Sequence, residues 1–313
     1  MKTIDVAVVV LESTLLSTAF GVEDMLMICN QFCKRNDEAS FKVNRISEGK
    51  FIIDDTHYDV IIIPPLLVPS GFTFELSALN AWLIHHYHTG TILTSACVGS
   101  FFLAKTGLLD GKKATTHWQY EENFRASFSS VTLESDKILI DEGKIITAGG
   151  VSAYMDLVLH IIEKFHSKES AQHCANILLV DRGRDSQKCY KELSQATFIE
   201  DDEIKELLLW IKENLRDEYS TAILSQRLKL HERTFMRRFK NSVHSTPNQY
   251  IQELRVDAAK SLLVTTYKSF DEITSEVGFE NESSFRRLFK RETLLNPGEY
   301  RKKFQYHAGN LKI

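Results

Sequence analysis

The chain has 313 residues, 43% of them hydrophobic and 26% charged, which suits about two globular domains and excludes disordered, collagen-like and coiled-coil proteins. Its net charge of -4 conceals an asymmetry, because residues 1–219 carry 21 Lys and Arg against 32 Asp and Glu, whereas residues 220–313 carry 17 against 10. The basic C-terminal part therefore indicates a phosphate-rich partner for that part alone.

Neither the apolar runs nor the cysteines indicate an exported or membrane protein. The longest apolar runs, 6–11 and 60–68, fall far short of the roughly 20 residues that span a bilayer, and no signal-peptide pattern opens the sequence. The five cysteines are an odd number without the spacing of a disulfide framework, which suits a reducing compartment. We therefore expect a soluble, cytoplasmic protein with no membrane partner.

Short apolar runs alternate with helical patterns over the first 180 residues. Strands are predicted at 4–11, 58–63, 92–95 and 145–148, with edge strands at 41–46 and 137–140. Helices are predicted at 18–34, 75–88, 100–105, 153–165 and 169–179. This alternation predicts a flavodoxin-like α/β domain over residues 1–182, with a mostly parallel sheet and helices on both faces.

After this domain the pattern becomes purely helical. A polar, poorly periodic stretch predicts a linker over 183–202, which leaves an all-α domain over 203–313. This domain contains an internal repeat with a shift of 50 residues, which superposes Glu232, Phe235, Arg237, Phe239, Lys240, Pro247 and Tyr250 on Glu282, Phe285, Arg287, Phe289, Lys290, Pro297 and Tyr300. Two copies of one unit are therefore expected.

Each copy has the pattern of a helix-turn-helix unit. In the second copy, a helix over 270–277 ends at Gly278, a residue suited to the sharp turn, and Asn281 can cap a second helix over 282–293. Phe285 and Phe289 lie four residues apart and so face inward together, and the cationic residues lie largely on other faces. Between the copies, a helix over 247–264 is long enough to separate them rigidly.

A short helix braced across another has the dimensions to enter the major groove of DNA. The alternative, a cationic face that only keeps the domain soluble, is weakened by the presence of two copies in a basic segment. The tail also resembles the AraC/XylS family of bacterial transcription activators through Arg233-Thr-Phe-Met-Arg-Arg-Phe-Lys240, Val277-Gly-Phe279 and Ser284-Phe-Arg-Arg-Leu-Phe-Lys290.

This resemblance implies a set of DNA-binding residues. It implies base contacts from Arg233, Met236 and Arg237 in the first unit and from Glu282, Ser283 and Arg287 in the second, and the proposed interface also includes Lys240, Arg286 and Lys290. Two departures leave alternatives open. Leu228-Lys-Leu230 replaces the usual glycine-containing turn, and Glu282 either weakens binding or accepts a hydrogen bond from cytosine.

The N-terminal domain contains a strand, a small-residue turn with a cysteine, and a helix, in Ile92-Leu-Thr-Ser-Ala-Cys97-Val-Gly99. This arrangement is typical of a nucleophile elbow, and His117 follows twenty residues later. Together with Ala114-Thr-Thr-His-Trp118 and Thr147-Ala-Gly-Gly150, it resembles the ThiJ/PfpI branch of the class I glutamine amidotransferase-like fold. Joined to the tail, the domain order is similar to the GlxA-type branch of AraC regulators.

The catalytic carboxylate of that superfamily has no clear match here; only Glu12 and Asp24 are candidates. Cys97 therefore has three interpretations: a buried structural thiol, a residue of an effector pocket, or a live nucleophile. The working hypothesis is an effector pocket bordered by Cys97, Val98, His117 and Trp118, with no catalytic residues and Cys97 and His117 as at most a remnant of catalysis.

Other clusters are weaker candidates. Cys29 and Cys33 share a helical face and are expected to pack in the core, the histidines at 85, 86 and 88 are expected at a solvated helix end, and Asp181-Arg-Gly-Arg184 is expected in the linker. No cofactor motif or metal site is expected.

These observations predict a sequence-specific DNA-binding transcriptional regulator that is not an enzyme. The expected partners are double-stranded operator DNA, a small-molecule effector for which the resemblance suggests a nitrogenous metabolite, and a second copy of the chain, with RNA polymerase as a further candidate. A thiol-dependent enzyme that carries a DNA-binding tail is the alternative, and a pure interaction scaffold is a third hypothesis.

Overall fold

The computed structural model describes residues 2–36, 39–68, 76–193, 199 and 201–305, without the side chains of 33–36. The chain divides into two compact units, Met1–Gln187 and Lys188–Ile313, and each is described by itself. Within the described residues, no helix has the length and apolar character needed to cross a membrane.

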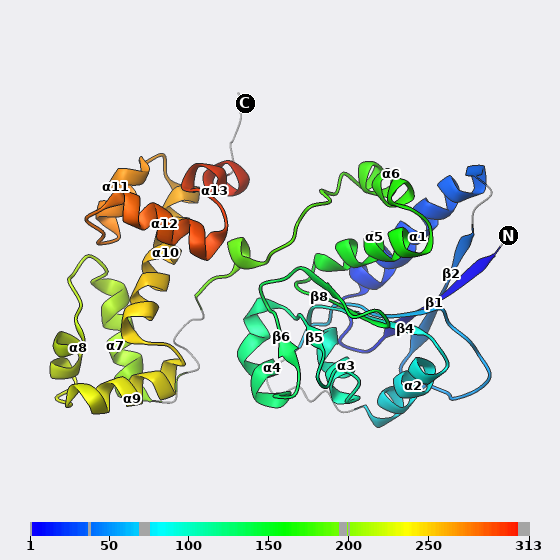
Figure 1. The fold of residues 1–313 in the computed structure, drawn as a ribbon, viewed down its shortest axis with the longest axis horizontal. Helices are drawn as coiled ribbons and strands as arrows, with labels where there is room; N and C mark the ends of the chain where they lie inside the picture. Colours follow the sequence, from blue (N-terminus) through cyan, green and yellow to red (C-terminus); the bar gives the residue numbers. More distant parts are fainter. Residues whose placement is uncertain (1, 37–38, 69–75, 194–198, 200, 306–313) are drawn as a thin grey trace. The chain divides into compact units, whose positions relative to one another are not determined.

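The first unit is built on a six-stranded sheet in the order β2-β1-β3-β4-β8-β7 (Figure 1). Its strands are β1 (Thr3–Val10), β2 (Ser40–Ser47), β3 (Val60–Ile63), β4 (Ile92–Ala96), β7 (Leu139–Asp141) and β8 (Ile145–Ala148). All neighbouring strands are parallel except β7 and β8, which are antiparallel. The four predicted central strands and both predicted edge strands are present, and the order of the first five matches that of a flavodoxin-like sheet.

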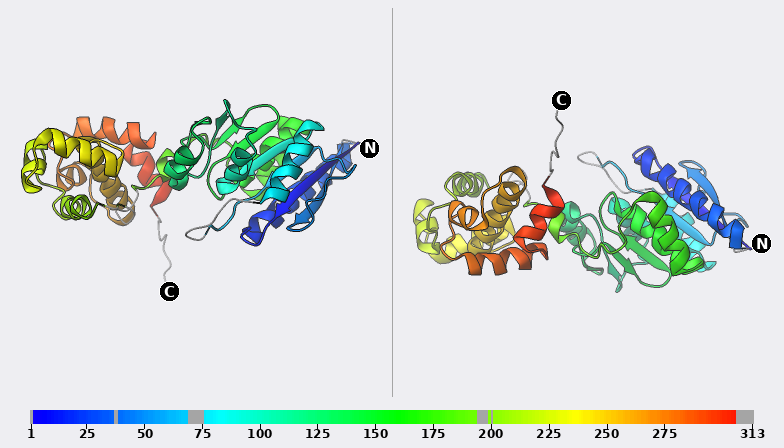
Figure 2. Two further views of the ribbon diagram at one scale, coloured as in Figure 1. Left: turned by 90° about the horizontal axis from the view of Figure 1, so that it is seen from below. Right: turned by 90° about the horizontal axis from the view of Figure 1, so that it is seen from above.

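Helices cover both faces of this sheet, as predicted (Figures 1 and 2). One face packs against α1 (Leu16–Asn36), α5 (Ala153–Phe165) and α6 (Lys168–Leu178). The other packs against α2 (Ser77–His88), α3 (Ser100–Lys105) and α4 (Glu121–Ser127), next to a small pair of strands, β5 (Lys113–Ala114) and β6 (Thr132–Leu133). Because side chains alternate along a strand, Val6 and Val8 enter the first core and Ala7 and Val9 the second.

Residues 182–189, which overlap the predicted linker over 183–202, contact one unit or the other. Arg182 pairs with Glu163 of α5, and Arg184 pairs with Asp156 of the same helix. Gln187 is buried in the first unit, and Cys189, in the short helix η3 (Lys188–Tyr190), is buried in the second. One residue, Lys188, therefore separates two buried anchors.

The second unit contains seven α-helices among its described residues: α7 (Asp202–Glu213), α8 (Thr221–Arg227), α9 (Glu232–Val243), α10 (Pro247–Thr265), α11 (Phe270–Glu276), α12 (Glu282–Thr293) and α13 (Pro297–Phe304). They form two hydrophobic cores, one around α7–α9 and one around α11–α13. Helix α10 contributes its first half to the first core and its second half to the other. The predicted pair of helix-turn-helix units joined by one helix is confirmed.

The two helix-turn-helix units form the same turn with different residues. Lys229 and Gly278 both adopt a left-handed conformation, with φ of 54° and 83°. The next backbone N–H donates to an equivalent carbonyl in each copy, Leu230 to Ser225 at 2.9 Å and Phe279 to Thr274 at 3.0 Å. The first turn, uncertain from the sequence, therefore has the same geometry without glycine.

Of the histidines expected at a solvated end of α2, His88 is exposed, whereas His86 is buried. His86 is only 1% exposed, because it lies on the same face of the helix as the buried Trp82. Its ring contacts Trp82 and Tyr58, with centroids 4.6 Å and 5.3 Å away, and within the described part of the chain neither ring nitrogen has a hydrogen-bond partner. Burial, together with the nearby His85, therefore lowers the pKa of His86 to about 4.

This burial predicts a pH-dependent stability. His86 is neutral in the folded state but titrates near its ordinary pKa of 6.5 when the chain unfolds, so its contribution is complete above that pH and is lost as the pH falls toward 4. Between pH 7 and pH 5 we expect a loss of about 2 kcal/mol in the free energy of unfolding, measured by denaturant titration. His86→Leu should flatten this dependence, whereas the control His88→Leu, at an exposed position, should keep it. Equal pH slopes in the wild type and His86→Leu would contradict the assignment.

Candidate nucleic-acid interface and effector pocket

The second helix of each helix-turn-helix unit, α9 or α12, is called its reader helix below. Helix α9 has a buried apolar side and an exposed cationic side. Phe235 and Phe239 are fully buried in the first core, with ring centroids 5.6 Å apart. Arg233, Arg237 and Lys240 are exposed, and Met236 is half-buried against the core. Three of the four side chains assigned to DNA on this helix are thus available to a partner.

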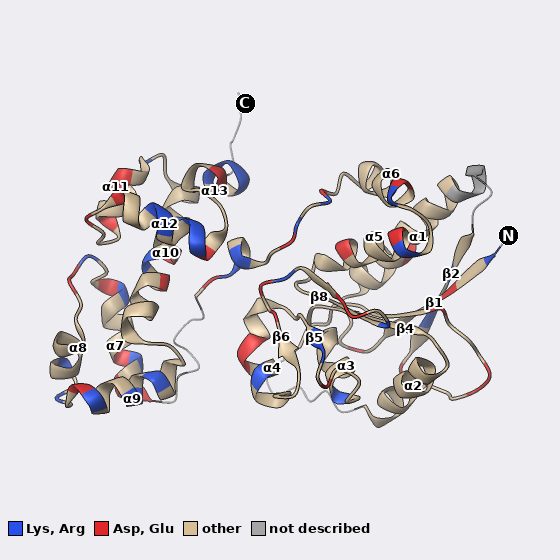
Figure 3. Ribbon diagram, viewed as in Figure 1, with Lys and Arg blue, Asp and Glu red and all other residues tan. Residues whose placement is uncertain are grey.

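Helix α12 repeats this arrangement in the second helix-turn-helix unit. Phe285 and Phe289 are fully buried, and the exposed positions include Ser283, Arg286, Arg287 and Lys290. Arg286 pairs with Glu282 one turn earlier and lies over the Phe270 ring, 5.0 Å from its centroid. Within the described residues, Arg287 makes one side-chain hydrogen bond, from its Nη2 to the Ser284 hydroxyl at 3.1 Å. Figure 3 shows the Lys and Arg residues on α9, α12 and α13.

A side-chain cap marks the start of α12 but not that of α9. The Asn281 side chain accepts a hydrogen bond from the Ser284 N–H at 2.8 Å, as predicted for the cap of α12. Helix α9 starts after His231, which makes no side-chain cap. The preceding helices α8 and α11 are capped by Ser220 and Ser269.

Arg238 on α9 has a different role from its neighbour Arg237, and sequence analysis did not single it out. Its Nε and Nη2 donate to the two carboxylate oxygens of Asp201 at 2.6 Å and 2.7 Å, and its Nη1 lies 2.6 Å from Glu203. The guanidinium holds the pKa of Asp201 below its usual value. Arg238 therefore ties α9 to the start of α7.

In the α/β unit, Met1–Gln187, Cys97 occupies the predicted elbow between β4 and α3. Its φ of 56° is unusual for a residue with a side chain, and it marks a strained turn. Gly99 allows the turn to approach β3, because a Cβ there would lie 2.9 Å from the carbonyl oxygen of Ile63. The Ser100 hydroxyl donates to Thr116 at 2.9 Å, and the Thr116 hydroxyl donates to the Cys97 carbonyl at 3.1 Å.

The environment of Cys97 disfavours a thiolate. The side chain is 3% exposed, and burial raises the pKa of its thiol to about 12. Burial also lowers the pKa of His117, whose Nδ1 accepts a hydrogen bond from the Gln119 N–H at 3.1 Å. Tyr120, which sequence analysis did not select, lies close by: its ring centroid is 6.1 Å from that of His117, and burial raises the pKa of its hydroxyl.

The two carboxylates considered as partners of Cys97 are not buried with it. Glu12 and Asp24 are both exposed, and burial together with the nearby Asp24 raises the pKa of Tyr154 in α5. In the described residues neither makes a hydrogen bond or ion pair with Cys97 or His117. Cys29 is buried, as expected for core packing, whereas the side chain of Cys33 is outside the described part.

Gln187 connects the elbow region to the end of the unit, and no local sequence signal marks it. Its Nε2 lies 2.8 Å from the carbonyl oxygens of Thr116 and Ser135 and 3.0 Å from that of Lys137, and its Oε1 accepts from the Trp118 N–H at 3.3 Å. The absence of a side chain at Gly149 makes room, because a Cβ there would lie 1.9 Å from Nε2. Two of these contacts, with Thr116 and Trp118, involve the stretch that carries His117.

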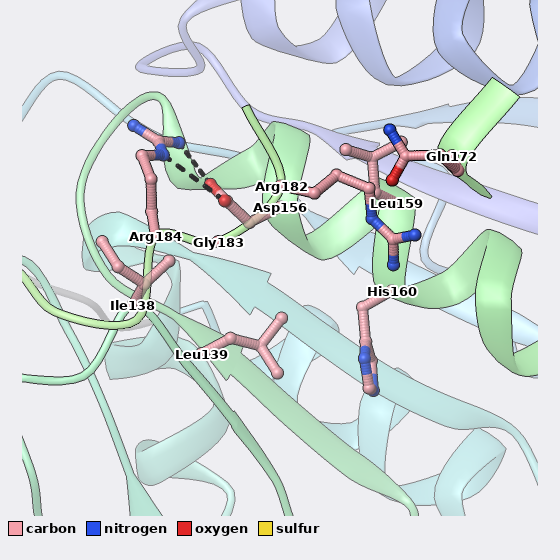
Figure 4. A pocket seen from close by; sticks show the side chains of 9 residues that line it. All are labelled: Ile138, Leu139, Asp156, Leu159, His160, Gln172, Arg182, Gly183 and Arg184. Carbon is pink, nitrogen blue, oxygen red and sulfur yellow. Dashed lines mark hydrogen bonds and ion pairs between the residues drawn. The ribbon is translucent and has the colours of Figure 1, made fainter. Parts of the chain in front are cut away.

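A hollow of about 380 Å³ lies between β7, α5, α6 and the segment 182–184 (Figure 4). Its charged side chains already have partners within the unit. Arg184 pairs with Asp156, Arg182 with Glu163, and His160 Nε2 lies 2.8 Å from Asp141. These charged side chains are therefore already paired within the unit. No group of three or more His, Cys, Asp or Glu side chains in the described residues is arranged to hold a metal ion.

Comparison with known proteins identifies both parts of the chain. A model of the DJ-1/PfpI family matches residues 4–164, about half of the chain and nearly all of the sheet with its elbow. The chain belongs to the DJ-1/PfpI family. A helix-turn-helix domain model matches residues 224–303, which include both reader helices. This DJ-1/PfpI family member therefore joins its α/β domain to an AraC-type helix-turn-helix domain, as the sequence predicted.

The individual relatives include a transcriptional regulator and an enzyme. The HTH-type transcriptional regulator CdhR of Pseudomonas aeruginosa is 28% identical over 226 residues, which cover 72% of this chain and 67% of CdhR. Isonitrile hydratase of Pseudomonas putida is 35% identical over 80 residues, 26% of this chain and 34% of that enzyme. The crystal structure of an AraC family transcriptional regulator from Pseudomonas putida matches with a TM-score of 0.46 and 16% identity, over 56% of this chain and 99% of that one.

The raised pKa of Cys97 predicts slow alkylation. Because the thiolate is the reactive form, the rate of iodoacetamide labelling at this residue should rise about tenfold per pH unit from pH 7 to pH 9.5 without a plateau. Peptide mapping by mass spectrometry follows Cys97 separately from the other cysteines, and labelling in denaturant supplies the control. A plateau near neutral pH in the folded protein would contradict a buried, protonated thiol.

Proposed function

We propose that this protein is a sequence-specific DNA-binding transcriptional regulator, in which α9 and α12 each enter a major groove. The observation that carries the proposal is the repeat in three dimensions. Each helix buries two phenylalanines and exposes cations at matching positions, Arg237 and Lys240 in one copy and Arg287 and Lys290 in the other. The relative CdhR, a transcriptional regulator by name, supports the same function.

Within this function the proposed DNA-binding side chains divide by what they contact. Arg233, Met236 and Arg237 on α9, and Glu282, Ser283 and Arg287 on α12, contact base edges. Lys240, Arg286 and Lys290 contact phosphates and contribute affinity for any sequence. The pairing of Glu282 with Arg286 supports a carboxylate that is neutralised locally and can accept from a base without repelling the backbone.

Selection from a randomised pool of duplex oligonucleotides tests this function. At moderate ionic strength, the full chain should enrich a sequence with two half-sites about one helical turn apart. Its affinity for the enriched duplex should exceed that for a scrambled duplex by at least about 1,000-fold, and both affinities should fall as salt rises. Equal affinity for both duplexes would overturn the proposal.

We further propose that the DJ-1/PfpI domain binds a small nitrogenous effector beside the elbow, in a pocket bordered by Cys97, Val98, His117 and Trp118. Gln187 supports this role, because it contacts the backbone of Thr116 and Trp118 and is followed, two residues later, by Cys189 in the DNA-binding unit. A ligand that moves the His117 segment would thus act on the connection between units.

Ligand-dependent thermal shifts test the effector proposal. A panel of amines, amino acids and other nitrogenous metabolites should contain a compound that raises the melting temperature and alters operator affinity. Both responses should be lost in Trp118→Ala and kept in His88→Ala, a control at an exposed position of α2. A compound whose effect survives Trp118→Ala binds elsewhere and would contradict this pocket.

The assembly and location follow from the same proposal. A cytoplasmic homodimer would present two pairs of reader helices, which raises the effective concentration of each pair at adjacent sites. RNA polymerase is the further partner that activation would require. Light scattering of the purified chain measures the mass directly, and a monomer at micromolar concentration would contradict the dimer.

A thiol-dependent enzyme is the second candidate, favoured by the elbow at Cys97 and by the local likeness to isonitrile hydratase. Incubation with isonitriles, amides and ketoaldehydes distinguishes the two. We expect no turnover, because burial keeps the thiol protonated. Turnover that is abolished by Cys97→Ser would establish the enzyme.

A further inference from the structure

The two helix-turn-helix units meet at one arginine. In the middle of α10, Leu254 packs into the first core and Val256 into the second, so Arg255 lies at the boundary between them. Its Nε and Nη2 donate to the carbonyl oxygen of Leu215 at 3.2 Å and 3.1 Å, and Nη2 also donates to the Asp217 carbonyl at 2.8 Å. Leu215, in the loop after α7, packs against both cores.

The guanidinium of Arg255 also lies near one aromatic ring from each helix-turn-helix unit. Its carbon is 6.0 Å from the centroid of Tyr219, just before α8, and 5.3 Å from that of Phe279, just before α12. Phe279 in turn stacks on Phe285 of α12, with centroids 4.3 Å apart. Arg255 therefore connects the loop of the first unit to the base of the second reader helix.

Gly278 completes this junction from the second unit. A Cβ at this position would lie 2.7 Å from the Leu215 carbonyl oxygen, 2.9 Å from the Cα of Arg216 and 2.9 Å from Nη2 of Arg255. Arg216 adds a second link, because its Nε donates to the carbonyl oxygen of Glu276 at 3.1 Å. The backbones of the two units thus touch where only glycine fits.

We propose that the junction formed by Arg255, Leu215, Arg216 and Gly278 sets the distance and angle between α9 and α12, and so determines which half-site spacing the protein binds. This proposal rests on the proposed DNA-binding function. Two readers that move together can engage both half-sites only at one separation and phase, since each added base pair rotates the second half-site by about 35°. Arg255 is thus a positioning residue that need not contact DNA.

The test compares operator duplexes that differ only in spacing. The full chain is titrated with the selected operator, with versions whose half-sites are one or two base pairs closer or farther apart, and with a duplex that has one half-site scrambled. The wild type should lose about tenfold or more in affinity at each wrong spacing. Arg255→Gln should bind the optimal spacing about tenfold more weakly, bind the single half-site within about threefold of wild type, and lose its preference among spacings.

Arg301→Gln is the matched control. Arg301 also donates from a half-buried position to two backbone carbonyls, those of Leu263 and Lys268, but both lie within the second unit. It should keep the spacing preference. If Arg255→Gln unfolds, Arg255→Lys replaces it in the test, because lysine keeps the charge but lacks the planar guanidinium that donates to two carbonyls. An equal loss by the Arg255 variant on every duplex, or an unchanged spacing preference, would overturn the proposal.

A measurement without DNA separates this proposal from the DNA-binding function itself. Spin labels attached through noncanonical amino acids at Asn241 and Arg291, two exposed and repeat-equivalent positions on α9 and α12, report the distance between the readers. The distribution should be narrow in the wild type and in Arg301→Gln and broad in Arg255→Gln. An unchanged distance distribution in Arg255→Gln would overturn the positioning role of Arg255, even if DNA binding is confirmed. If the distribution broadens but the protein does not bind DNA, only the proposed DNA-binding function is rejected.

Discussion

Replacing Arg237 and Arg287 together with alanine is expected to remove sequence-specific DNA binding and leave nonspecific binding largely intact. Both guanidiniums are exposed at equivalent positions on α9 and α12, and neither is committed to an ion pair in the described residues, unlike Arg238 or Arg286. A bidentate contact to guanine contributes about 1–3 kcal/mol of discrimination, and well-separated contacts are roughly additive. The double variant should therefore lose about 2–6 kcal/mol on the operator.

Fluorescence anisotropy with operator and scrambled duplexes at one salt concentration measures this difference. Arg287→Ala alone should relax the preference at one or two base pairs. Lys240→Ala is the control, because loss of a phosphate contact weakens all sequences alike and reduces the salt dependence. If Arg287→Ala weakened operator and random DNA equally, its assignment as a base-reading residue would be wrong.

Gly149→Ala is expected to cost about 3 kcal/mol in the free energy of unfolding of the DJ-1/PfpI domain. The new methyl group would lie 1.9 Å from the Gln187 amide nitrogen and 2.8 Å from the Thr116 carbonyl oxygen, so the Gln187 side chain must leave its site. The carbonyls of Thr116, Ser135 and Lys137 then lose this buried donor. Each unsatisfied buried group costs about 1–3 kcal/mol.

A double-mutant cycle in urea isolates this effect. Gln187→Ala removes the amide that the methyl group displaces, so adding Gly149→Ala to it should cost less than half of what it costs in the wild type. Gly183→Ala supplies the control, because a Cβ there meets no atom within 4 Å. Strict additivity of the two substitutions would contradict a direct coupling between Gly149 and Gln187.

The α/β sheet and the double helix-turn-helix were predictable because their signals are local and repeated. Alternating apolar runs placed the strands, since one side of each strand faces each core. The 50-residue repeat placed both reader helices, and the inward phenylalanines followed from their four-residue spacing. The elbow at Cys97 was likewise visible as a strand, a small-residue turn and a helix.

Other features of the candidate sites were not predictable, because they depend on residues far apart in the chain. The sequence presents Arg237 and Arg238 as equivalent neighbours, yet only Arg238 is held by Asp201, 37 residues earlier. His86 differed from the expected solvated cluster because Tyr58 and Trp82 enclose it. Gln187 gives no local signal at all, and its partners lie between 50 and 72 residues away.

The sequence by itself determined the two kinds of domain and the pair of helices that face DNA in our proposal, since periodicity, capping and repetition act over a few residues. Only the tertiary structure decided whether the left-handed turn needs glycine. Lys229 is exposed and bears its side chain without hindrance, whereas Gly278 touches the backbone of Leu215. Packing also decided the protonation of Cys97 and His86, because burial, unlike residue type, sets the cost of a charge.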